Sequence, residues 1–340
     1  MYFERMITAV DSHTEGMPTR VITSGFNSIP GKTMFEKKKY VEEHLDHLRT
    51  LLMFEPRGHG SMSGSILLPP SNPAADLGVV FIEVSGCLPM CGHGTIGTCT
   101  VAIETGLVKM KEPITQITLD TPAGLVTAEA KVSNGRVRSV KIRNVPAFLY
   151  RKDVDVKVDE FGKVRLDVAF GGNFYGILPA ESVGLSLDKR NSEALIDCGM
   201  KIMNAVRRQI PLVHPMHSAI NEIKHTMFTG PPTVQGADAK NTVVLYPGAL
   251  DRSPCGTGTS ARMAQLHARG ELPLNTDFVH ESIIGSLFTG RLEKEEQLTA
   301  EITAVVPTIE GRAWITGFQQ FVLDPEDPFP AGFLLNDQRS

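Results

Sequence analysis

The sequence predicts an α/β protein of two pseudo-symmetric lobes, each with a sheet and a central helix. Three observations predict this fold. A Cys-Gly-x-Gly-Thr motif occurs twice, beginning at Cys91 and at Cys255. Each motif leads into a helix-like stretch that ends at a glycine, Gly106 or Gly270. The number of residues from the cysteine to this glycine is the same in both halves. Extended, β-rich segments follow in both halves. A duplication accounts for all three features, and glycine just past a helix end is a favoured cap.

Length and composition set the class of protein. The chain has 340 residues, which is enough for two domains. Hydrophobic residues make up 41% of the chain and charged residues 21%, which is ordinary for a globular protein. A net charge of -4 provides no basic surface for nucleic acid or an anionic membrane. We find neither a membrane-length apolar run nor a signal peptide, so we expect a cytoplasmic protein whose five cysteines stay reduced.

The first half contains its elements in the following order. The segment 7–10 is strand-like. Thr33 and Glu36 form a capping box, and the helix after it carries an apolar stripe. The central helix begins at Cys91, and Asn134-Gly135 is typical of a β-hairpin turn. The members of the apolar stripe are Val41, Leu45, Leu48 and Leu52.

The second half repeats this plan. Asn191 and Ser192 are candidate helix caps, and apolar residues follow at helical spacing. The second central helix begins at Cys255, with extended chain over 283–292. The last stretch, 302–324, is strand-rich and is expected to return to the first lobe. The predicted lobes are residues 1–126 plus 303–340, and residues 127–302. The helix that follows the candidate caps Asn191 and Ser192 has its apolar residues at Leu195, Cys198, Ile202 and Val206.

Cys91 and Cys255 are the candidate chemical groups. Each precedes a helix, where free N–H groups and the helix dipole favour negative charge, so a lowered thiol pKa is expected. Two symmetry-related thiols can serve one carbon from opposite faces: one removes a proton and the other returns one, which inverts a stereocentre. The helix N-termini would hold an amino-acid carboxylate. This chemistry needs no cofactor and no metal.

The cysteines allow other interpretations. Cys99 and Cys198 fit buried apolar positions, and Cys87 is also better explained as structural. Cys87, Cys91, His93 and Cys99 lie close in sequence but lack the spacing of known zinc motifs. Cys91 and Cys255 could form a redox disulfide, although that role does not require two glycine-rich motifs. The glycines do not form a dinucleotide-binding fingerprint.

Five motifs spread along the chain resemble the proline racemase family, which includes proline racemases, 4-hydroxyproline 2-epimerases and trans-3-hydroxyproline dehydratases. The resemblance implies a diaminopimelate-epimerase-like fold, with a sheet wrapped around a central helix in each lobe, a site in the cleft and no cofactor. The motifs are Asp11-Ser12-His13-Thr14-Glu15-Gly16, Glu55-Pro56-Arg57-Gly58-His59-Gly60, Met90-Cys91-Gly92-His93-Gly94-Thr95-Ile96-Gly97, Phe170-Gly171-Gly172-Asn173-Phe174 and Asp251-Arg252-Ser253-Pro254-Cys255-Gly256-Thr257-Gly258-Thr259.

The resemblance also implies roles for residues. Cys91 and Cys255 match the two proton-transfer residues of the family. Asp251 matches the acidic group that receives the substrate amine, although an ordinary turn residue is the alternative. His93 flanks the same site. The backbone groups that match the family's carboxylate-binding segments are those of Gly92, His93, Gly256 and Thr257.

The substrate is predicted from a few positions. Dehydratases of the family typically have Thr where Cys255 stands, so two cysteines favour racemisation or epimerisation. Proline racemases tend to have Phe at the positions of Ser63 and Leu245. His225 matches a histidine that contacts substrate in the epimerases, and its alternative is a surface histidine at a strand start. A polar Ser63 and His225 suit a ring that carries a hydroxyl.

The sequence therefore predicts an isomerase that interconverts trans-4-hydroxy-L-proline and cis-4-hydroxy-D-proline. Racemisation of proline is the alternative. Dehydration of trans-3-hydroxy-L-proline, and a non-catalytic thiol redox or amino-acid-binding protein, are less favoured. The expected partners are a small-molecule substrate, with no nucleic acid and no membrane, and a homodimer is the expected assembly.

Overall fold

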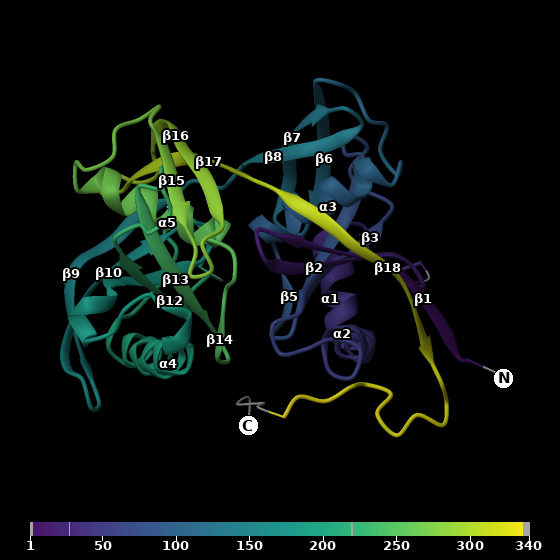
Figure 1. Cartoon of the computed structure of the whole chain (residues 1–340), viewed down its shortest axis with the longest axis horizontal. Helices are drawn as coiled ribbons and strands as arrows, with labels where there is room; N and C mark the ends of the chain where they lie inside the picture. The colour runs from purple at the N-terminus through teal and green to yellow at the C-terminus, as the bar shows by residue number, and fades with distance from the viewer. Residues whose placement is uncertain (1–2, 27, 219, 336–340) are drawn as a thin grey trace. The chain divides into compact units, whose positions relative to one another are not determined.

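The chain divides into two compact units, Met1–Ile142 with Gly311–Ser340, and Arg143–Glu310. The computed structural model describes residues 3–26, 28–218 and 220–335. The elements up to residue 143, with the last strand, are β1 (Arg5–Thr14), β2 (Met17–Ser24), α1 (Met34–His44), α2 (Asp46–Met53), β3 (Ser63–Leu68), β4 (Leu77–Glu83), β5 (Gly86–Leu88), α3 (Gly92–Glu104), β6 (Ile114–Thr121), β7 (Gly124–Ser133), β8 (Arg136–Arg143) and β18 (Ala313–Leu323) (Figure 1). The remaining elements are β9 (Phe148–Val158), β10 (Gly162–Phe170), β11 (Phe174–Pro179), the 3-10 turns η1 (Ala180–Val183) and η2 (Lys189–Asn191), α4 (Ser192–Gln209), β12 (Ile223–Gly230), β13 (Ala239–Leu245), β14 (Ala249–Leu250), α5 (Gly256–Ala268), β15 (Asp277–Glu281), β16 (Leu287–Gln297) and β17 (Thr303–Gly311).

The strand pairings of the two units match one for one. In the first unit β1–β2 is antiparallel, β2–β3 parallel, β3–β4 antiparallel, β4–β6 parallel and β6–β7 antiparallel. In the second unit β10–β11, β11–β12, β12–β13, β13–β15 and β15–β16 repeat these directions in the same order. Short β5 and β14 pair in the same way with β4 and β13. Since unrelated sheets would not agree at every step, the structure supports the duplication seen in the motifs.

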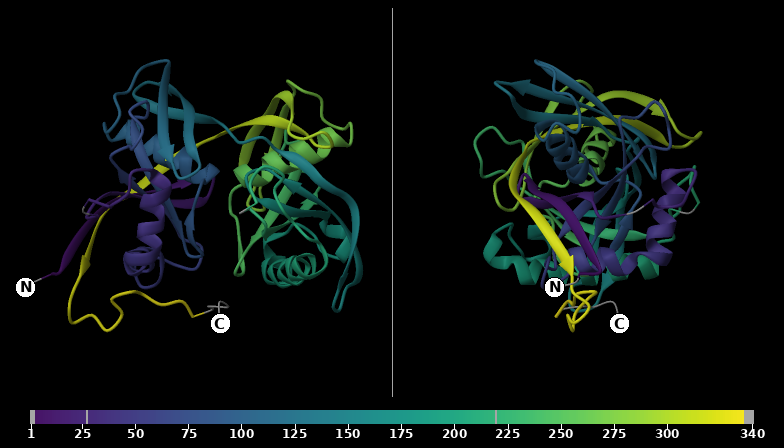
Figure 2. Two further views of the ribbon diagram at one scale, coloured as in Figure 1. Left: turned by 180° about the vertical axis from the view of Figure 1, so that it is seen from behind. Right: turned by 90° about the vertical axis from the view of Figure 1, so that its right-hand side faces the viewer.

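The last strand completes the first unit, as the sequence predicts. β18 pairs antiparallel with β1 over the whole length of that strand, and Figure 2 shows the two strands side by side. β9 occupies the corresponding place beside β10 in the second unit. The first unit therefore needs the C-terminal part of the chain to complete its sheet.

One central helix lies inside each unit. Every residue of α3 except Glu104 is buried, and the helix contacts β1, β2, β3, β7 and β18. α5 is buried over most of its length and contacts β9, β10, β11 and β16. A helix enclosed on several sides needs small residues where strands approach. At Gly97 a Cβ atom would lie 2.7 Å from the side chain of Thr19. The expected arrangement of strands around a central helix is confirmed.

Further helices cover the outer face of each sheet. In the second unit α4 packs Leu195, Cys198 and Ile202 onto Phe228 and Val244. In the first unit the predicted stripe is divided between two helices, because α1 ends at His44 and α2 begins at Asp46. Thr33 caps α1 as predicted, its hydroxyl accepting from the N–H of Glu36.

Positive backbone angles occur where the sequence predicts turns. Asn134 and Gly135 join β7 to β8 with φ of 54° and 66°. Gly106 and Gly270, the predicted helix-ending glycines, have φ of 79° and 76°. These are left-handed values that glycine adopts without a Cβ penalty.

The lobe limits expected from the sequence, at 126/127 and 302/303, stay a prediction. Within the described residues, β7 pairs with β6 and β8 pairs with β7, so this hairpin is hydrogen-bonded to the first unit.

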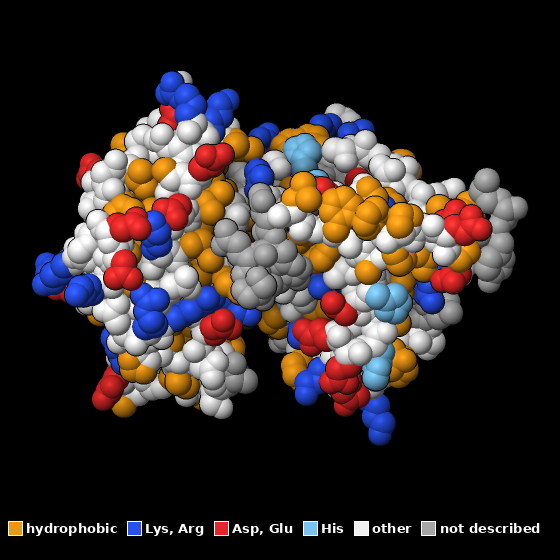
Figure 3. Space-filling view, turned by 90° about the horizontal axis from the view of Figure 1, so that it is seen from below, with side chains coloured by type: hydrophobic (Ala, Val, Ile, Leu, Met, Phe, Trp, Pro, Cys, Tyr) orange, Lys and Arg blue, Asp and Glu red, His pale blue; other side chains and the backbone are white. Residues whose placement is uncertain are grey.

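On the face shown in Figure 3, acidic and basic side chains are interspersed. Across the described part of the chain, no helix has both the length and the apolar character that crossing a bilayer requires.

Candidate active site

The Cys91 half-site lies where β3, β4 and the start of α3 meet. Cys91 is the N-cap residue of α3, in extended conformation, and its side chain is buried. The following residues supply the N–H groups of the first helical turn, which have no partner within a helix and attract anions. Gly94 leaves room for the thiol, because a Cβ atom here would make tight contacts, 3.0 Å from the Cys91 Sγ and 3.1 Å from Phe81. The sequence motif thus places a thiol at the N-terminus of α3, where free N–H groups are able to bind an anion.

A histidine lies beside this thiol. The Cys91 Sγ is 3.4 Å from His93 Nδ1 and 3.7 Å from Nε2. Ser63 Oγ is 2.8 Å from His93 Nε2 and donates its single proton to the Pro18 carbonyl at 2.6 Å. Ser63 must therefore accept from Nε2–H, which leaves a lone pair on Nδ1 next to the thiol. The arrangement can take the thiol proton onto the imidazole.

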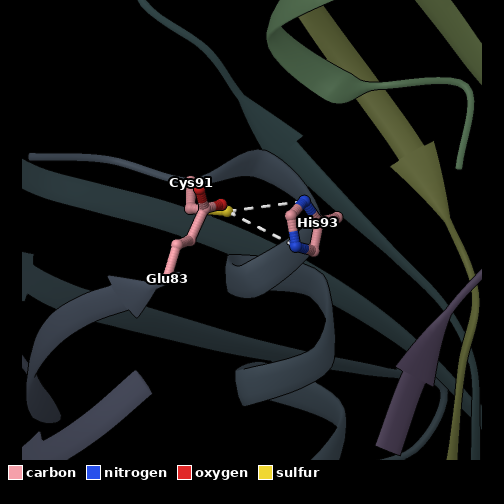
Figure 4. A group of neighbouring side chains, drawn as sticks. All are labelled: Glu83, Cys91 and His93. Carbon is pink, nitrogen blue, oxygen red and sulfur yellow. Dashed lines mark hydrogen bonds between the residues drawn. The ribbon is translucent and has the colours of Figure 1, made fainter. Parts of the chain in front are cut away.

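Glu83 completes a group of three donor residues in this half-site. It is the last residue of β4 and the cross-strand partner of Ser63 on β3. One ligand atom each from Glu83, Cys91 and His93 lie within 4.8 Å of one another (Figure 4). Glu83 is not predicted from the sequence, since nothing near it in the chain marks it as functional. Cys87 and Cys99, which lie close to Cys91 in the sequence, are not part of this group.

The Cys255 half-site has the same backbone plan with different neighbours. Cys255 is the N-cap residue of α5, with φ of 64°, and is buried. A Cβ atom at Gly258 would lie 3.0 Å from the Cys255 Sγ, the same distance as from a Cβ atom at Gly94 to the Cys91 Sγ. The Tyr175 hydroxyl lies 3.4 Å from Cys255 Sγ and 2.6 Å from Thr257 Oγ1. Hydroxyl groups thus take the place that an imidazole has beside Cys91.

Asp251 is connected to Cys255 through one serine. Ser253 donates its N–H and its hydroxyl to Asp251 Oδ1, both at 2.8 Å, and the Cys255 N–H donates to Ser253 Oγ at 3.1 Å. Asp251 is buried. Its buried carboxylate can bind a cation, as the amine-binding role carried over from the family requires.

The pKa of Cys255 departs from the sequence-based expectation. A helix N-terminus alone predicts a lowered pKa. Here burial raises the pKa of Cys255 well above its ordinary value, and the charge of Asp251 raises it further. Hydrogen bonds with Tyr175, Gly258 and Thr257 act in the opposite direction and do not compensate. The prediction of a lowered pKa is therefore wrong for Cys255, because desolvation outweighs the helix end.

The other three cysteines behave as structural residues. Burial raises the pKa of Cys87 to about 12 and that of Cys198 to about 11, and it raises the pKa of Cys99 as well. Thiols that stay protonated at neutral pH react slowly.

Tyr175, His225 and Leu245 form a row across the sheet. They are register partners on β11, β12 and β13, so their side chains share one face. Tyr175 and His225 stack with ring centroids 4.8 Å apart. The Tyr175 hydroxyl contacts the Cys255 sulfur at one end of this row. His225 and Leu245, which the sequence predicts to line the ring pocket, therefore lie on the same face of the sheet as the thiol. Tyr175 was missed, although it directly follows the motif that ends at Phe174.

His225 is a neutral hydrogen-bonding group. Burial lowers its pKa to about 3, against a hydrogen bond with the Phe174 backbone that raises it. Nδ1 is buried and has no hydrogen-bond partner among the described residues. Since that bond to the Phe174 carbonyl uses the other ring nitrogen as donor, Nδ1 is left as an acceptor.

Comparison with known proteins identifies the family. A sequence model described as proline racemase matches residues 9–334. A 4-hydroxyproline 2-epimerase from Streptosporangium roseum is 58% identical over 338 residues, covering 98% of this chain and all of that protein. The chain belongs to the proline racemase family. A proline racemase from Clostridioides difficile is 45% identical over 335 residues, covering 98% of this chain and 100% of that protein.

Solved structures of other proteins have the same fold as this chain. A hydroxyproline epimerase from Agrobacterium vitis, with bound trans-4-OH-L-proline, aligns with a TM-score of 0.90 and 35% identity, covering 99% of this chain and 98% of that one. A PhzF-family phenazine biosynthesis protein from Bacillus anthracis, only 14% identical, shares the fold with a TM-score of 0.61, covering 93% and 99%. The predicted family, the fold class and the isomerase class are confirmed.

Proposed function

We propose that this member of the proline racemase family is a cofactor-independent epimerase that interconverts trans-4-hydroxy-L-proline and cis-4-hydroxy-D-proline. The observation that carries the substrate is the 58% identity with a 4-hydroxyproline 2-epimerase along almost the entire chain, compared with 45% for a proline racemase. A related structure that holds trans-4-OH-L-proline supports a small-molecule substrate of this size.

The reaction moves one proton off the α-carbon and another onto it. A thiolate of one half-site takes the α-proton, and the electron pair of the broken C–H bond is delocalised into the substrate carboxylate. The thiol of the other half-site then donates its proton to the opposite face of the carbon. The product has inverted configuration, and the two sulfurs have exchanged protonation states. We assign the two sulfurs to Cys91 and Cys255.

Backbone N–H groups stabilise the developing charge. Gly92 and His93 open α3, and Gly256 and Thr257 open α5. Groups of this kind act on a carboxylate that gains negative charge as the α-proton leaves, so they stabilise the transition state more than the ground state. Asp251 receives the substrate ammonium group.

The ammonium group also changes the reactivity of Cys255. In the free protein the Asp251 charge helps to raise the pKa of that thiol. An ammonium bound at Asp251 offsets this charge, so the pKa of Cys255 falls when substrate is present. The Cys91 thiol instead lies next to His93 Nδ1, which can accept its proton. We infer that Cys255 stays protonated in the free enzyme, whereas Cys91 is the sulfur that can pass its proton to a neighbouring base, which is the combination that inversion needs.

Ser63 acts through His93 in this proposal. The sequence predicts that Ser63 lies in the substrate pocket. Its hydroxyl proton is donated to Pro18, and its oxygen accepts from His93. A serine engaged in this way orients the imidazole against Cys91, so we assign it that task rather than hydrogen-bond donation to the ring hydroxyl.

His225 recognises the ring hydroxyl. Its buried Nδ1 accepts a hydrogen bond from the 4-hydroxyl group, which satisfies an otherwise unpartnered atom. Proline has no hydroxyl group that can donate a hydrogen bond to His225 Nδ1. Leu245 lies next to His225 and supplies an apolar contact for the ring.

Chiral chromatography of reaction products tests the assignment. The purified protein is incubated separately with trans-4-hydroxy-L-proline, L-proline and trans-3-hydroxy-L-proline. We expect cis-4-hydroxy-D-proline as the main product and a much lower kcat/KM for proline. Faster conversion of proline would make the protein a proline racemase, and loss of water from 3-hydroxyproline would make it a dehydratase. No product from any substrate would leave a binding or redox protein. Cytoplasmic location and a homodimer stay predictions.

A further inference from the structure

The donor residues around Cys91 form a set that the epimerisation mechanism uses only in part. Glu83 ends β4, Cys91 caps α3 and His93 lies in its first turn. The three side chains offer a carboxylate oxygen, a sulfur and a ring nitrogen, all within 4.8 Å of one another (Figure 4). Proton transfer by Cys91 requires the sulfur and gains from the imidazole, but it gives Glu83 no task.

The spacing of two of the donors fits a tetrahedral metal ion. Zinc binds thiolate sulfur at about 2.3 Å and imidazole nitrogen at about 2.0 Å, and a tetrahedral angle then separates the two ligand atoms by about 3.5 Å. The Cys91 Sγ and His93 Nδ1 are 3.4 Å apart. Little rearrangement is therefore needed for both atoms to bind one ion.

The histidine is already in the form that a metal ligand needs. Ser63 accepts from Nε2–H, so the ring is held in the tautomer whose Nδ1 carries a lone pair. Such an outer hydrogen bond is typical of metal-binding histidines, because it sets both the tautomer and the ring orientation. Ser63 and Glu83 are cross-strand partners, so the same pair of strands presents the carboxylate and the orienting hydroxyl.

The second half-site offers a different set. The sulfur of Cys255 has the hydroxyls of Tyr175 and Thr257 as neighbours, and Leu245 ends β13 where Glu83 ends β4. Within the described residues, the group of Glu83, Cys91 and His93 is the only one that brings three such donors together. A metal ion should therefore distinguish between the two catalytic thiols.

We propose that Glu83, Cys91 and His93 form an inhibitory site for Zn²⁺ and similar borderline-soft divalent cations. Binding replaces the thiol proton of Cys91 by the metal, and the proton is released to solvent. The sulfur electron pair that would take the substrate α-proton is then held in the metal–sulfur bond, so epimerisation stops until the ion is removed. The binding step depends on the three side chains alone, and only its inhibitory consequence rests on the proposed function.

Cobalt titration of the full-length protein tests the site, because a thiolate bound to Co²⁺ produces a charge-transfer absorption band. We expect this band to saturate at one equivalent in the wild type, to persist in Cys255→Ser and to disappear in Cys91→Ser. Glu83→Gln should weaken Co²⁺ and Zn²⁺ binding by about tenfold or more, by analogy with the loss of other metal-site partners. Glu43→Gln makes the same charge change at an exposed position of α1 and should titrate like the wild type.

The activity assay completes the test. Zn²⁺ should inhibit epimerisation reversibly, EDTA should restore it, and Glu83→Gln should remain active while resisting Zn²⁺. A band that survives Cys91→Ser but is lost in Cys255→Ser, unchanged metal affinity in Glu83→Gln, or no uptake of either ion would overturn the proposal. A protein that binds cobalt through Cys91 but never epimerises would leave the site in place and refute only the proposed function.

Discussion

Cys91 and Cys255 occupy equivalent places in two copies of one structural plan, yet their sulfurs have different neighbours. Each caps a buried helix and is followed by a glycine that leaves room for the sulfur. His93 lies beside the first sulfur, whereas Tyr175 and an indirectly linked Asp251 lie near the second. The duplication preserved the helix ends that we propose bind a carboxylate. It diverged in the groups around each sulfur, as the proposed reaction with one base and one acid requires.

Removing either thiol should have the largest effect. Cys91→Ser and Cys255→Ser should each lower the rate of inversion by at least about a thousandfold, because a serine hydroxyl is a far weaker base and general acid–base contributions reach this size. Chiral chromatography of 4-hydroxyproline measures the rate. Cys198→Ser, a buried change outside both half-sites, should affect stability and leave the rate nearly unchanged. Near-normal inversion by either active-site variant would exclude two thiols acting on opposite faces.

Asp251→Asn should separate the reactivity of Cys255 from turnover. The variant loses the group that we propose binds the substrate ammonium, so kcat/KM should fall by about a hundredfold, the value of a lost charged hydrogen bond. The same change removes a charge that raises the pKa of Cys255. Cys255 in the free variant should therefore be alkylated faster than in the wild type.

Iodoacetamide labelling followed by mass spectrometry measures this difference. In the wild type we expect Cys91 to react before Cys255, with Cys87, Cys99 and Cys198 slowest, and pyrrole-2-carboxylate should protect both active-site thiols. Slower labelling of Cys255 in Asp251→Asn, or equal labelling of all five cysteines, would contradict the assigned electrostatics.

Tyr175→Phe should disturb the second half-site alone. Its hydrogen bond lowers the pKa of Cys255, so loss of the hydroxyl raises that pKa further. The contribution of Cys255 thiolate then requires more alkaline conditions. In the direction of epimerisation in which Cys255 removes the α-proton, the pH profile of kcat/KM should move upward by about one unit, with roughly tenfold lower activity at neutral pH. Tyr150→Phe, in which the lost hydroxyl donates to the Pro211 carbonyl at 3.5 Å, is the matched control. An unshifted profile in Tyr175→Phe would remove Tyr175 from the mechanism.

His225→Ala should have the smallest effect and the most selective one. We expect a roughly tenfold loss of kcat/KM for 4-hydroxyproline and little loss for proline, because only the former leaves a hydroxyl without its partner. Comparing both substrates in one variant separates recognition from damage to the fold. If both rates fall equally, His225 does not read the hydroxyl, and the preference for 4-hydroxyproline needs another explanation.

Local patterns predicted much of this architecture. Repeated Cys-Gly-x-Gly motifs, the Thr33 cap and the glycines at 106 and 270 each report on a few neighbouring residues, and the structure confirms all of them. The break at Leu45 was missed because α1 and α2 together keep the apolar spacing of one helix.

The candidate site was predictable only where its residues adjoin the cysteines in sequence. Glu83 and Tyr175 reach the sulfurs from other strands, and single-sequence periodicity carries no information on such contacts. The raised pKa of Cys255 depends on burial and on Asp251 in the folded protein. A rule based on the helix N-terminus alone could not include the effect of burial or of the Asp251 charge.

Isotope incorporation in heavy water tests the two-thiol account most directly. The enzyme is incubated in D₂O with protiated trans-4-hydroxy-L-proline, and both epimers are recovered at low conversion and analysed by mass spectrometry. If one sulfur removes the α-proton and the other delivers a solvent-derived one, the product carries deuterium at the α-carbon while the remaining substrate stays protiated. Deuterium entering substrate as fast as product, or a product that retains the original proton, would show a single base and contradict the account.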